Sequence, residues 1–458
     1  MYDCNLFTND IETKKTNYLI ALLSISIYIG NYFFYSYIWV LIITFLLVYY
    51  YQIINKKYEV YLFGIIICRT MNGFLIINND VAYDIINILI CYLPLLIFCF
   101  QSFRRRAFIS LDFLLRYKFT LIIIVYYSFL SIINIEYSSY VIKARVLPLI
   151  FFAISILYIQ PEINFKRLQS YIRCMLIASL ILYLFIDYAD RTAFLYSDLN
   201  VLKLPIEQAL VNFLDLSKNF GTVYDARIWG IICYLYILIA IKNKYTNNYS
   251  VFYFDIILAL AVSITTLSRG GIIVACMITI SYFINKITIS KLIIFVLLTS
   301  MGLILIYFST ENIDKFIDTF NLKNSANAIE QRSMFLDYAY SQFKEHPIFG
   351  LGLGYLKSGN INSLDVGNGN ISDAFWFIIS AETGIVGLIL LILFYLEVII
   401  KKNIVVICFT IGFFIQLYGT DVPDMGIFYF YFLIIVHLLF KNINFTRKNN
   451  YELRLKPA

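Results

Sequence analysis

The chain has 458 residues, of which 61% are hydrophobic and 14% are charged, and its net charge is +7. Its apolar runs reach the length of about 20 residues that a helix needs to cross a bilayer. This composition excludes a soluble protein of two or three domains. It predicts an all-α, polytopic membrane protein in which residues 1–458 form a single integral domain.

Apolar segments alternate with short polar ones along most of the chain and indicate about 14 membrane-spanning helices. Residues 1–15 are polar and acidic and lack the pattern of a cleavable signal peptide, so we expect the first transmembrane helix to direct insertion. In chain order the predicted spans are 18–36, 38–54, 60–78, 83–100, 119–134, 146–159, 171–187, 228–241, 251–268, 270–284, 291–308, 374–399, 403–419 and 425–440.

An even number of spans puts both termini on the same side of the membrane. The short basic connections then all share that face, which carries well over half of the 36 lysines and arginines. By the positive-inside rule this face, with both termini, is cytoplasmic. Its basic residues are Lys14, Lys15, Lys56, Lys57, Arg104, Arg105, Arg106, Arg116, Lys118, Lys166, Arg167, Arg173, Lys242, Lys244, Lys286, Lys291, Lys401, Lys402 and those of the tail from Lys441 to Lys456.

Two long connections, 188–227 and 309–373, are left on the outer, periplasmic face. Loops of this length are usually functional or disordered. Apolar residues recur at helical spacing within them, for example Ile206, Leu210 and Phe213 in the first. We therefore expect both loops to contain helices.

The second long loop carries the most informative stretch of the sequence. Its residues 328–345 have the apolar spacing of a helix headed by Arg332, and His346-Pro347 ends that helix because proline cannot continue it. Gly352 and Gly354 follow in a glycine-rich run that can take positive φ and approach a ligand closely.

Four polar residues at the outer membrane edge are candidate site residues, because ionisable groups are costly there. They are Arg227, Arg269, Arg332 and Asp373. Each also has a structural interpretation: arginines at a membrane edge can extend to lipid headgroups, and Asp373 can be the N-cap of the next helix. His346 can likewise be a structural or solvated residue.

Metal and disulfide sites are not indicated. The eight cysteines form no CxxC or Cys/His cluster, and no acidic cluster of the metal-ligand type is present. We therefore predict no metal and no cofactor, and no nucleic-acid partner.

The order of several short motifs resembles the O-antigen ligase and polymerase superfamily of bacterial envelope glycan assembly. The resemblance covers about residues 260–395. The motifs are Ser268-Arg269-Gly270, then Arg332, then His346-Pro347, then Gly350, Gly352 and Gly354, and finally Glu382-x-Gly384-x-x-Gly387.

One departure separates this chain from the ligases of that superfamily. Ligases carry a His-Asn pair nine residues before the glutamate of the last motif, whereas this chain has Asp373-Ala374 before Glu382. The chain is therefore more similar to a Wzy-type O-antigen polymerase. That resemblance implies a location in the bacterial inner membrane and transfer of an undecaprenyl-pyrophosphate-linked glycan onto another lipid-linked repeat unit.

The resemblance also implies roles for the candidate residues. Arg269 and Arg332, with Arg227 as a third candidate, would hold the leaving pyrophosphate, and arginine would take the place of a divalent metal. Asp373 is the first candidate for the general base and His346 the second.

Partners and rival functions follow from the same interpretation. The partners are the lipid-linked oligosaccharide and membrane lipid, with a chain-length regulator as a candidate protein partner. A ligase of the same superfamily and a polyprenyl-glycan flippase or transporter are the alternatives. Transporters generally have repeated halves and short loops, which this sequence lacks.

Overall fold

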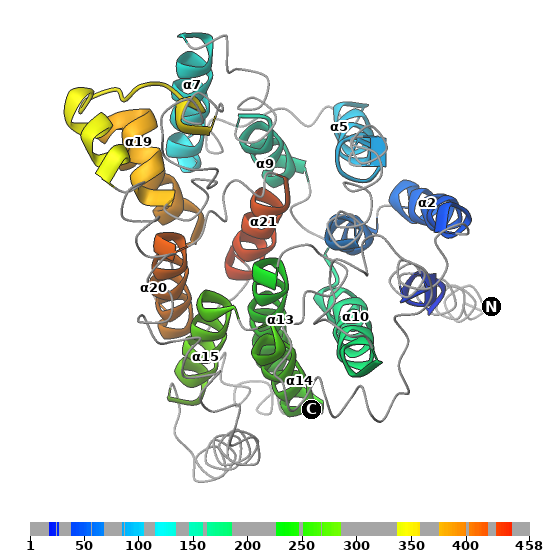
Figure 1. Cartoon of the computed structure of the whole chain (residues 1–458). Helices are drawn as coiled ribbons and strands as arrows, with labels where there is room; N and C mark the ends of the chain where they lie inside the picture. Colours follow the sequence, from blue (N-terminus) through cyan, green and yellow to red (C-terminus); the bar gives the residue numbers. More distant parts are fainter. Residues whose placement is uncertain are drawn as a thin grey trace, which may run out of the picture.

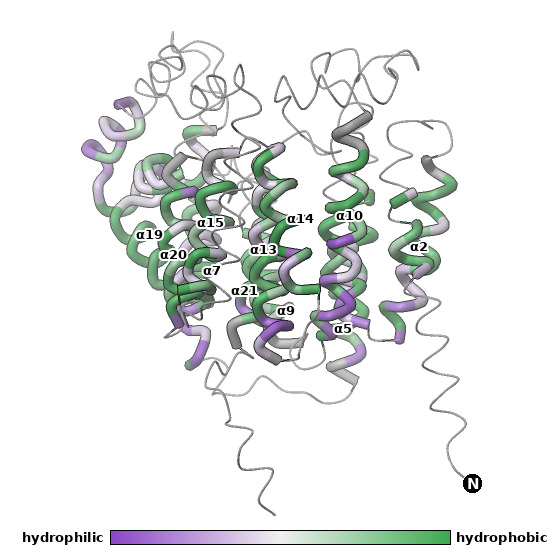
Figure 2. The backbone as a smooth tube through the Cα atoms, turned by 90° about the horizontal axis from the view of Figure 1, so that it is seen from below, coloured by the Kyte–Doolittle hydropathy of each residue, from purple (hydrophilic) through white to green (hydrophobic). Residues whose placement is uncertain are grey.

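Every regular element among the described residues of the computed structural model is a helix, which confirms the predicted all-α class. The long helices run side by side, and their middle parts are apolar (Figure 2). The structure describes residues 18–23, 25–26, 38–55, 57–67, 85–86, 88–104, 115–133, 146–158, 163–185, 226–246, 251–266, 268–284, 337–357, 375–399, 403–419 and 427–441.

Figure 1 labels the long helices and leaves two short ones, of the π and 3₁₀ type, without a label. Further helical segments, among them 18–23, 58–67 and 337–345, also carry no label. The elements are α2 (Ile38–Ile54), η2 (Ile88–Tyr92), α5 (Leu93–Arg104), α7 (Lys118–Ile133), α9 (Leu147–Tyr158), α10 (Phe165–Phe185), α13 (Ala226–Thr246), α14 (Phe252–Thr265), α15 (Arg269–Ile284), η6 (Tyr355–Lys357), α19 (Phe375–Ile399), α20 (Ile404–Gly419) and α21 (Ile427–Lys441).

Several helices agree closely with the predicted spans. Helices α2, α7 and α20 begin and end within one residue of their predicted bounds. By length and composition, two helices among the described residues can cross a membrane, Ile228–Tyr245 and Phe375–Ile399, and several shorter ones are strongly apolar. The span predicted at 291–308 lies outside the described residues, so the number of 14 spans stays a prediction.

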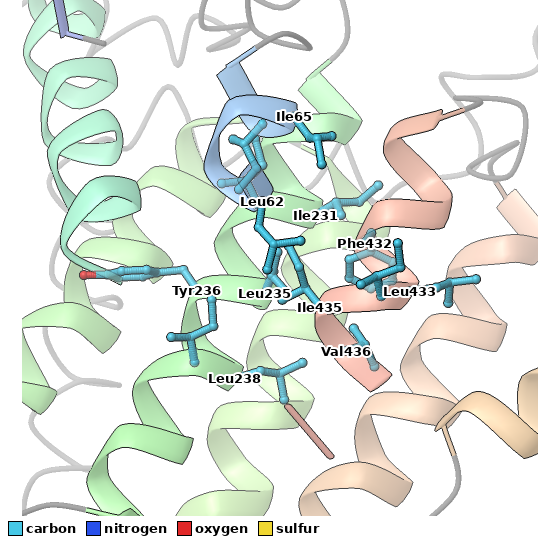
Figure 3. Packing of buried hydrophobic residues seen from close by; sticks show 14 of the residues in the cluster. Leu62, Ile65, Ile231, Leu235, Tyr236, Leu238, Phe432, Leu433, Ile435 and Val436 are labelled. Carbon is cyan, nitrogen blue, oxygen red and sulfur yellow. The ribbon is translucent and has the colours of Figure 1, made fainter. Parts of the chain in front are cut away.

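Helix α13 occupies the centre of the bundle. Every residue from 228 to 243 is buried, as expected of a helix that other helices surround. It contacts α10, α14, α15 and α21, and Figure 1 shows α15, α20 and α19 along one side of it and α10, α5 and α2 along the other. In Figure 3, Ile231 of α13 lies between Leu62 of helix 58–67 and Phe432 of α21.

Polar contacts join helix ends that the sequence assigns to the basic face. Nε of Arg173 donates to Oδ1 of Asp255 at 2.7 Å, and Nη1 of Arg167 donates to Oε1 of Glu59 at 3.1 Å. These contacts bring together α10, the start of α14 and the start of helix 58–67. They agree with the prediction that the short basic connections share one end of the bundle.

A second group of contacts ties the end of α19 to the start of α7. The carboxylate of Glu397 accepts hydrogen bonds from the backbone N–H groups of Phe119, at 3.1 Å, and Thr120, at 2.9 Å. It satisfies donors that the first turn of a helix leaves without an intrahelical acceptor. Nearby, the hydroxyl of Tyr117 and Nε2 of His437 are 2.8 Å apart.

Candidate functional site

Two glycines bring the starts of α13 and α15 into contact. A Cβ built on Gly271 would lie 2.7 Å from the Cα of Gly230, and one built on Gly230 would lie 3.1 Å from the Cα of Gly271. Small residues permit this close approach of membrane helices. Arg227 precedes Gly230 by three residues and Arg269 precedes Gly271 by two, so both predicted arginines are at this end of the bundle.

Helix α20 connects this region to the start of α19. A Cβ on Gly270 would lie 2.8 Å from Cγ of Gln416, so the end of α20 touches α15. The ring of Trp376 stacks on Phe414 with centroids 5.4 Å apart, and its Nε1 donates to the Phe414 carbonyl at 3.3 Å. Helix α20 thus contacts the first turn of α15 through Gln416 and the first turn of α19 through Phe414.

Helix α19 is broken at Gly384, whose φ of 63° and ψ of −169° are not helical. The break frees backbone groups that a continuous helix would pair internally, and residues 346–357, which we name the inserted segment, pair with them. The hydrogen bonds are Leu351 N–H to Ala381 C=O at 2.9 Å, Gly352 N–H to Glu382 C=O at 2.8 Å, Ile385 N–H to Pro347 C=O at 2.9 Å and Val386 N–H to Ile348 C=O at 3.3 Å.

The glycines of the inserted segment take the positive φ that the sequence predicts. The values are 73° for Gly350, 104° for Gly352 and 84° for Gly354. A Cβ on Gly350 would lie 2.4 Å from the carbonyl carbon of Glu382, so the close approach at this position is to α19. Contact of Gly352 and Gly354 with substrate stays a prediction.

His346 begins the inserted segment and is exposed. Its backbone N–H donates to the Gln342 carbonyl at 3.1 Å, and its carbonyl accepts from the Gly350 N–H at 3.0 Å. The helix at 337–345 therefore ends at this histidine, as the His-Pro pair predicts. The backbone of His346 is fixed on both sides, and its ring is accessible to solvent.

The helix at 337–345 and η6 pack together on the first half of α19. Ala339, Leu356, Ile378 and Ala381 form a small buried cluster there. Burial raises the pKa of the neighbouring Tyr338 phenol above its ordinary value. Residues 337–357 are therefore held on α19 by side chains as well as by the backbone.

The other predicted site residues are described in part or not at all. The structure describes the backbone of Arg227 and Arg269, each in the first turn of its helix. Arg332 and Asp373 lie outside the described residues. The roles assigned to these four residues stay predictions.

Metal-binding side chains do not gather in the part of the chain that the structure describes. No three of its His, Cys, Asp and Glu residues lie close enough together to hold a metal ion. Its cysteines Cys91, Cys174, Cys233, Cys276 and Cys408 are free thiols.

Sequence reasoning did not anticipate how Glu382 and Tyr126 hold the break in α19. Glu382 is fully buried, and its Oε1 accepts a hydrogen bond from the Leu356 N–H at 3.2 Å. The hydroxyl of Tyr126 on α7 donates to the Thr383 carbonyl at 2.7 Å. Glu382 inside an apolar span was the one signal of an unusual local structure, because an ionisable side chain is costly in a transmembrane helix.

The comparisons with known proteins bear on this same region. Residues 254–392 match the family described as O-antigen ligase (Wzy_C), and this range contains Arg269, Arg332, His346, Asp373 and Glu382. A search of curated proteins finds no match to the chain. Residues 254–392 are therefore a Wzy_C domain of the O-antigen ligase family, part of the O-antigen ligase/polymerase superfamily.

Proposed function

We propose that this protein is an O-antigen polymerase of the bacterial inner membrane. It transfers a growing glycan from undecaprenyl pyrophosphate onto the non-reducing sugar of another lipid-linked repeat unit at the periplasmic face. The superfamily acts on lipid-linked glycans, which supports the substrate class. Asp373-Ala374, at the position where ligases carry His-Asn, favours polymerase over ligase.

The observation that carries this proposal is the contact between Gly230 and Gly271. It brings together the helix starts that contain Arg227 and Arg269. Two arginines in the first turns of neighbouring helices suit a pyrophosphate, since arginine stays charged and pairs bidentately with phosphate oxygens. Helix N-termini add partial positive charge at the same place.

The proposed reaction is a displacement at the anomeric carbon of the donor glycan. The acceptor hydroxyl oxygen forms the new glycosidic bond while the bond from that carbon to the pyrophosphate breaks. The Asp373 carboxylate takes the hydroxyl proton, with His346 as the second candidate base. Arg269 and Arg332, with Arg227, stabilise the charge that develops on the departing undecaprenyl pyrophosphate, and such preorganised charge usually supplies the largest catalytic contribution.

We assign both chain termini and the basic connections to the cytoplasm, with 14 spans between them. The grouping of Arg173 with Asp255 and of Arg167 with Glu59 supports one common end for those connections. Under this topology the starts of α13, α15 and α19 face the periplasm, where the lipid-linked glycan is available.

A ligase of the same superfamily is the second candidate, since the matched family is described as O-antigen ligase. Lipopolysaccharide from a deletion strain, separated on a gel, distinguishes the functions. Loss of a polymerase leaves a core capped by a single repeat unit, and the wild-type gene restores the ladder. A core without any repeat, together with accumulated lipid-linked polymer, would identify a ligase instead. Loss of all surface repeats without such polymer would identify a flippase.

A further inference from the structure

Glu382 occupies an unusual position for a carboxylate. It lies in the first half of α19, two residues before the break at Gly384, and its side chain has no solvent exposure. Burying an ionisable group is costly unless hydrogen bonds compensate for lost hydration. A carboxylate in this position is therefore expected to do something that an apolar side chain cannot.

Glu382 contacts the inserted segment through both its backbone and its side chain. Its backbone carbonyl accepts the Gly352 N–H at 2.8 Å, and Gly350 packs directly on its carbonyl carbon. Its side chain extends further along the segment, where Oε1 accepts the Leu356 N–H at 3.2 Å. One residue of α19 thus holds the inserted segment at three points, of which only the last depends on the side chain.

The side-chain contact lies in the part of the inserted segment that makes no backbone hydrogen bond to the break in α19 among those given above. Residues 347–352 are fixed by direct hydrogen bonds to the break in α19, whereas Leu356 belongs to η6, beyond Gly354. A short 3₁₀ turn that follows three glycines of positive φ has little intrinsic stability. The Glu382 carboxylate is therefore suited to fix the far end of the glycine-rich run.

We propose that Glu382 is a positioning residue for glycan transfer: its buried side chain holds η6 on α19 and so fixes the glycine-rich run and His346 beside the reaction. The role in transfer rests on the proposed function. The mechanical part, that Glu382 holds the inserted segment, does not. This role depends on the length of the side chain and not on its charge, because a neutral amide oxygen accepts the Leu356 N–H as a carboxylate does.

Two conservative variants separate the effect of side-chain length from the effect of charge. Glu382→Gln keeps the length and an acceptor oxygen but removes the charge, whereas Glu382→Asp keeps the charge but is one methylene shorter. We expect Glu382→Gln to polymerise within about twofold of the wild type. We expect Glu382→Asp to be slowed by about tenfold or more, since a displacement of about 1 Å near a site can cost that much. The slow rate should persist at saturating donor, because more substrate does not reposition the segment.

Hydrogen exchange of the purified protein in detergent tests the mechanical part without any activity assay. Peptides covering residues 346–357 should exchange about tenfold faster in Glu382→Asp and at the wild-type rate in Glu382→Gln. Glu397→Asp is the matched control, because Glu397 also accepts backbone N–H groups but lies about 22 Å along α19 from Glu382. It should lower the melting temperature and leave exchange of the inserted segment unchanged.

The outcomes are distinct. Equal loss of activity in both Glu382 variants would mean that the charge matters and would overturn the positioning role, as would wild-type activity and exchange in both. Glu382→Asp can exchange faster while the deletion strain still makes a full ladder. That combination would leave the mechanical part intact and refute the polymerase assignment. Should Glu382→Asp fail to reach the membrane, the proposal fails if Glu382→Gln exchanges faster than the wild type.

Discussion

Gly384 of α19 lies directly against the backbone of Ile348 in the inserted segment. A Cβ built on Gly384 would be 2.2 Å from the Ile348 carbonyl oxygen and 2.4 Å from its carbonyl carbon, and Gly384 has a φ of 63°. Backbone atoms that hydrogen-bond to Val386 cannot move aside as the end of a long side chain can. The break in α19 and the shape of the inserted segment therefore depend on each other.

We expect Gly384→Ala to lower the free energy of unfolding by roughly 2–4 kcal/mol, because it adds strain at positive φ to a backbone clash. Thermal unfolding of the purified protein in detergent measures this change. Gly412→Ala is the control, since a Cβ there meets Met277 Sδ and Val274 Cγ2 at 3.3 Å and stays in a regular helix. A melting temperature of Gly384→Ala equal to that of Gly412→Ala would contradict the close contact.

The sequence predicts the helices of this protein well, because long apolar runs have one stable form in a bilayer. It also predicts the end of helix 337–345 at His346-Pro347 and the positive φ of Gly352 and Gly354. It predicts α10 less well: the helix begins at Phe165, six residues before the predicted 171. Partly buried ion pairs of Arg167 and Arg173 stabilise this polar first part, and hydropathy does not detect such partners.

The contact between α19 and the inserted segment could not be predicted from periodicity. Glu382 and Gly384 lie within one continuous apolar run, which predicts an uninterrupted helix over 374–399. The break is stable because backbone groups from residues 347–352 replace the lost intrahelical hydrogen bonds. The paired residues are 30 to 38 positions apart in the chain, and a local pattern carries no information about such a distant partner.

The contact between α13 and α15 provides a second prediction. Gly271→Ala puts a methyl group 2.7 Å from the Cα of Gly230, so the two helix starts must separate. We expect the lipopolysaccharide ladder to shorten strongly while the protein remains in the membrane, because the arginines of the two helices move apart. Gly412→Ala again serves as the control and should give the wild-type ladder. A normal ladder in Gly271→Ala would show that the spacing of α13 and α15 is unimportant for transfer.

The proposed pyrophosphate site predicts the behaviour of its arginines. Arg269→Ala and Arg332→Ala should each leave single-repeat-capped lipopolysaccharide at a normal level of protein in the membrane. Lysine at either position should restore only part of the ladder, since it keeps the charge but loses the bidentate geometry. Arg116→Ala is a suitable control, because Arg116 is exposed just before α7 in a predicted cytoplasmic connection. Full ladders in both alanine variants would remove these arginines from the site.

The last prediction separates two roles of Asp373. Asparagine is as good an N-cap as aspartate, so Asp373→Asn preserves a capping role at the start of α19 but cannot accept the proton of the acceptor hydroxyl. We expect this variant to lose polymerisation by about 100-fold or more, with the melting temperature of the wild type. Asp337→Asn, which changes an exposed carboxylate of the helix at 337–345, should give a normal ladder. A normal ladder in Asp373→Asn would move the role of base to His346, and His346→Gln would then have to abolish the ladder.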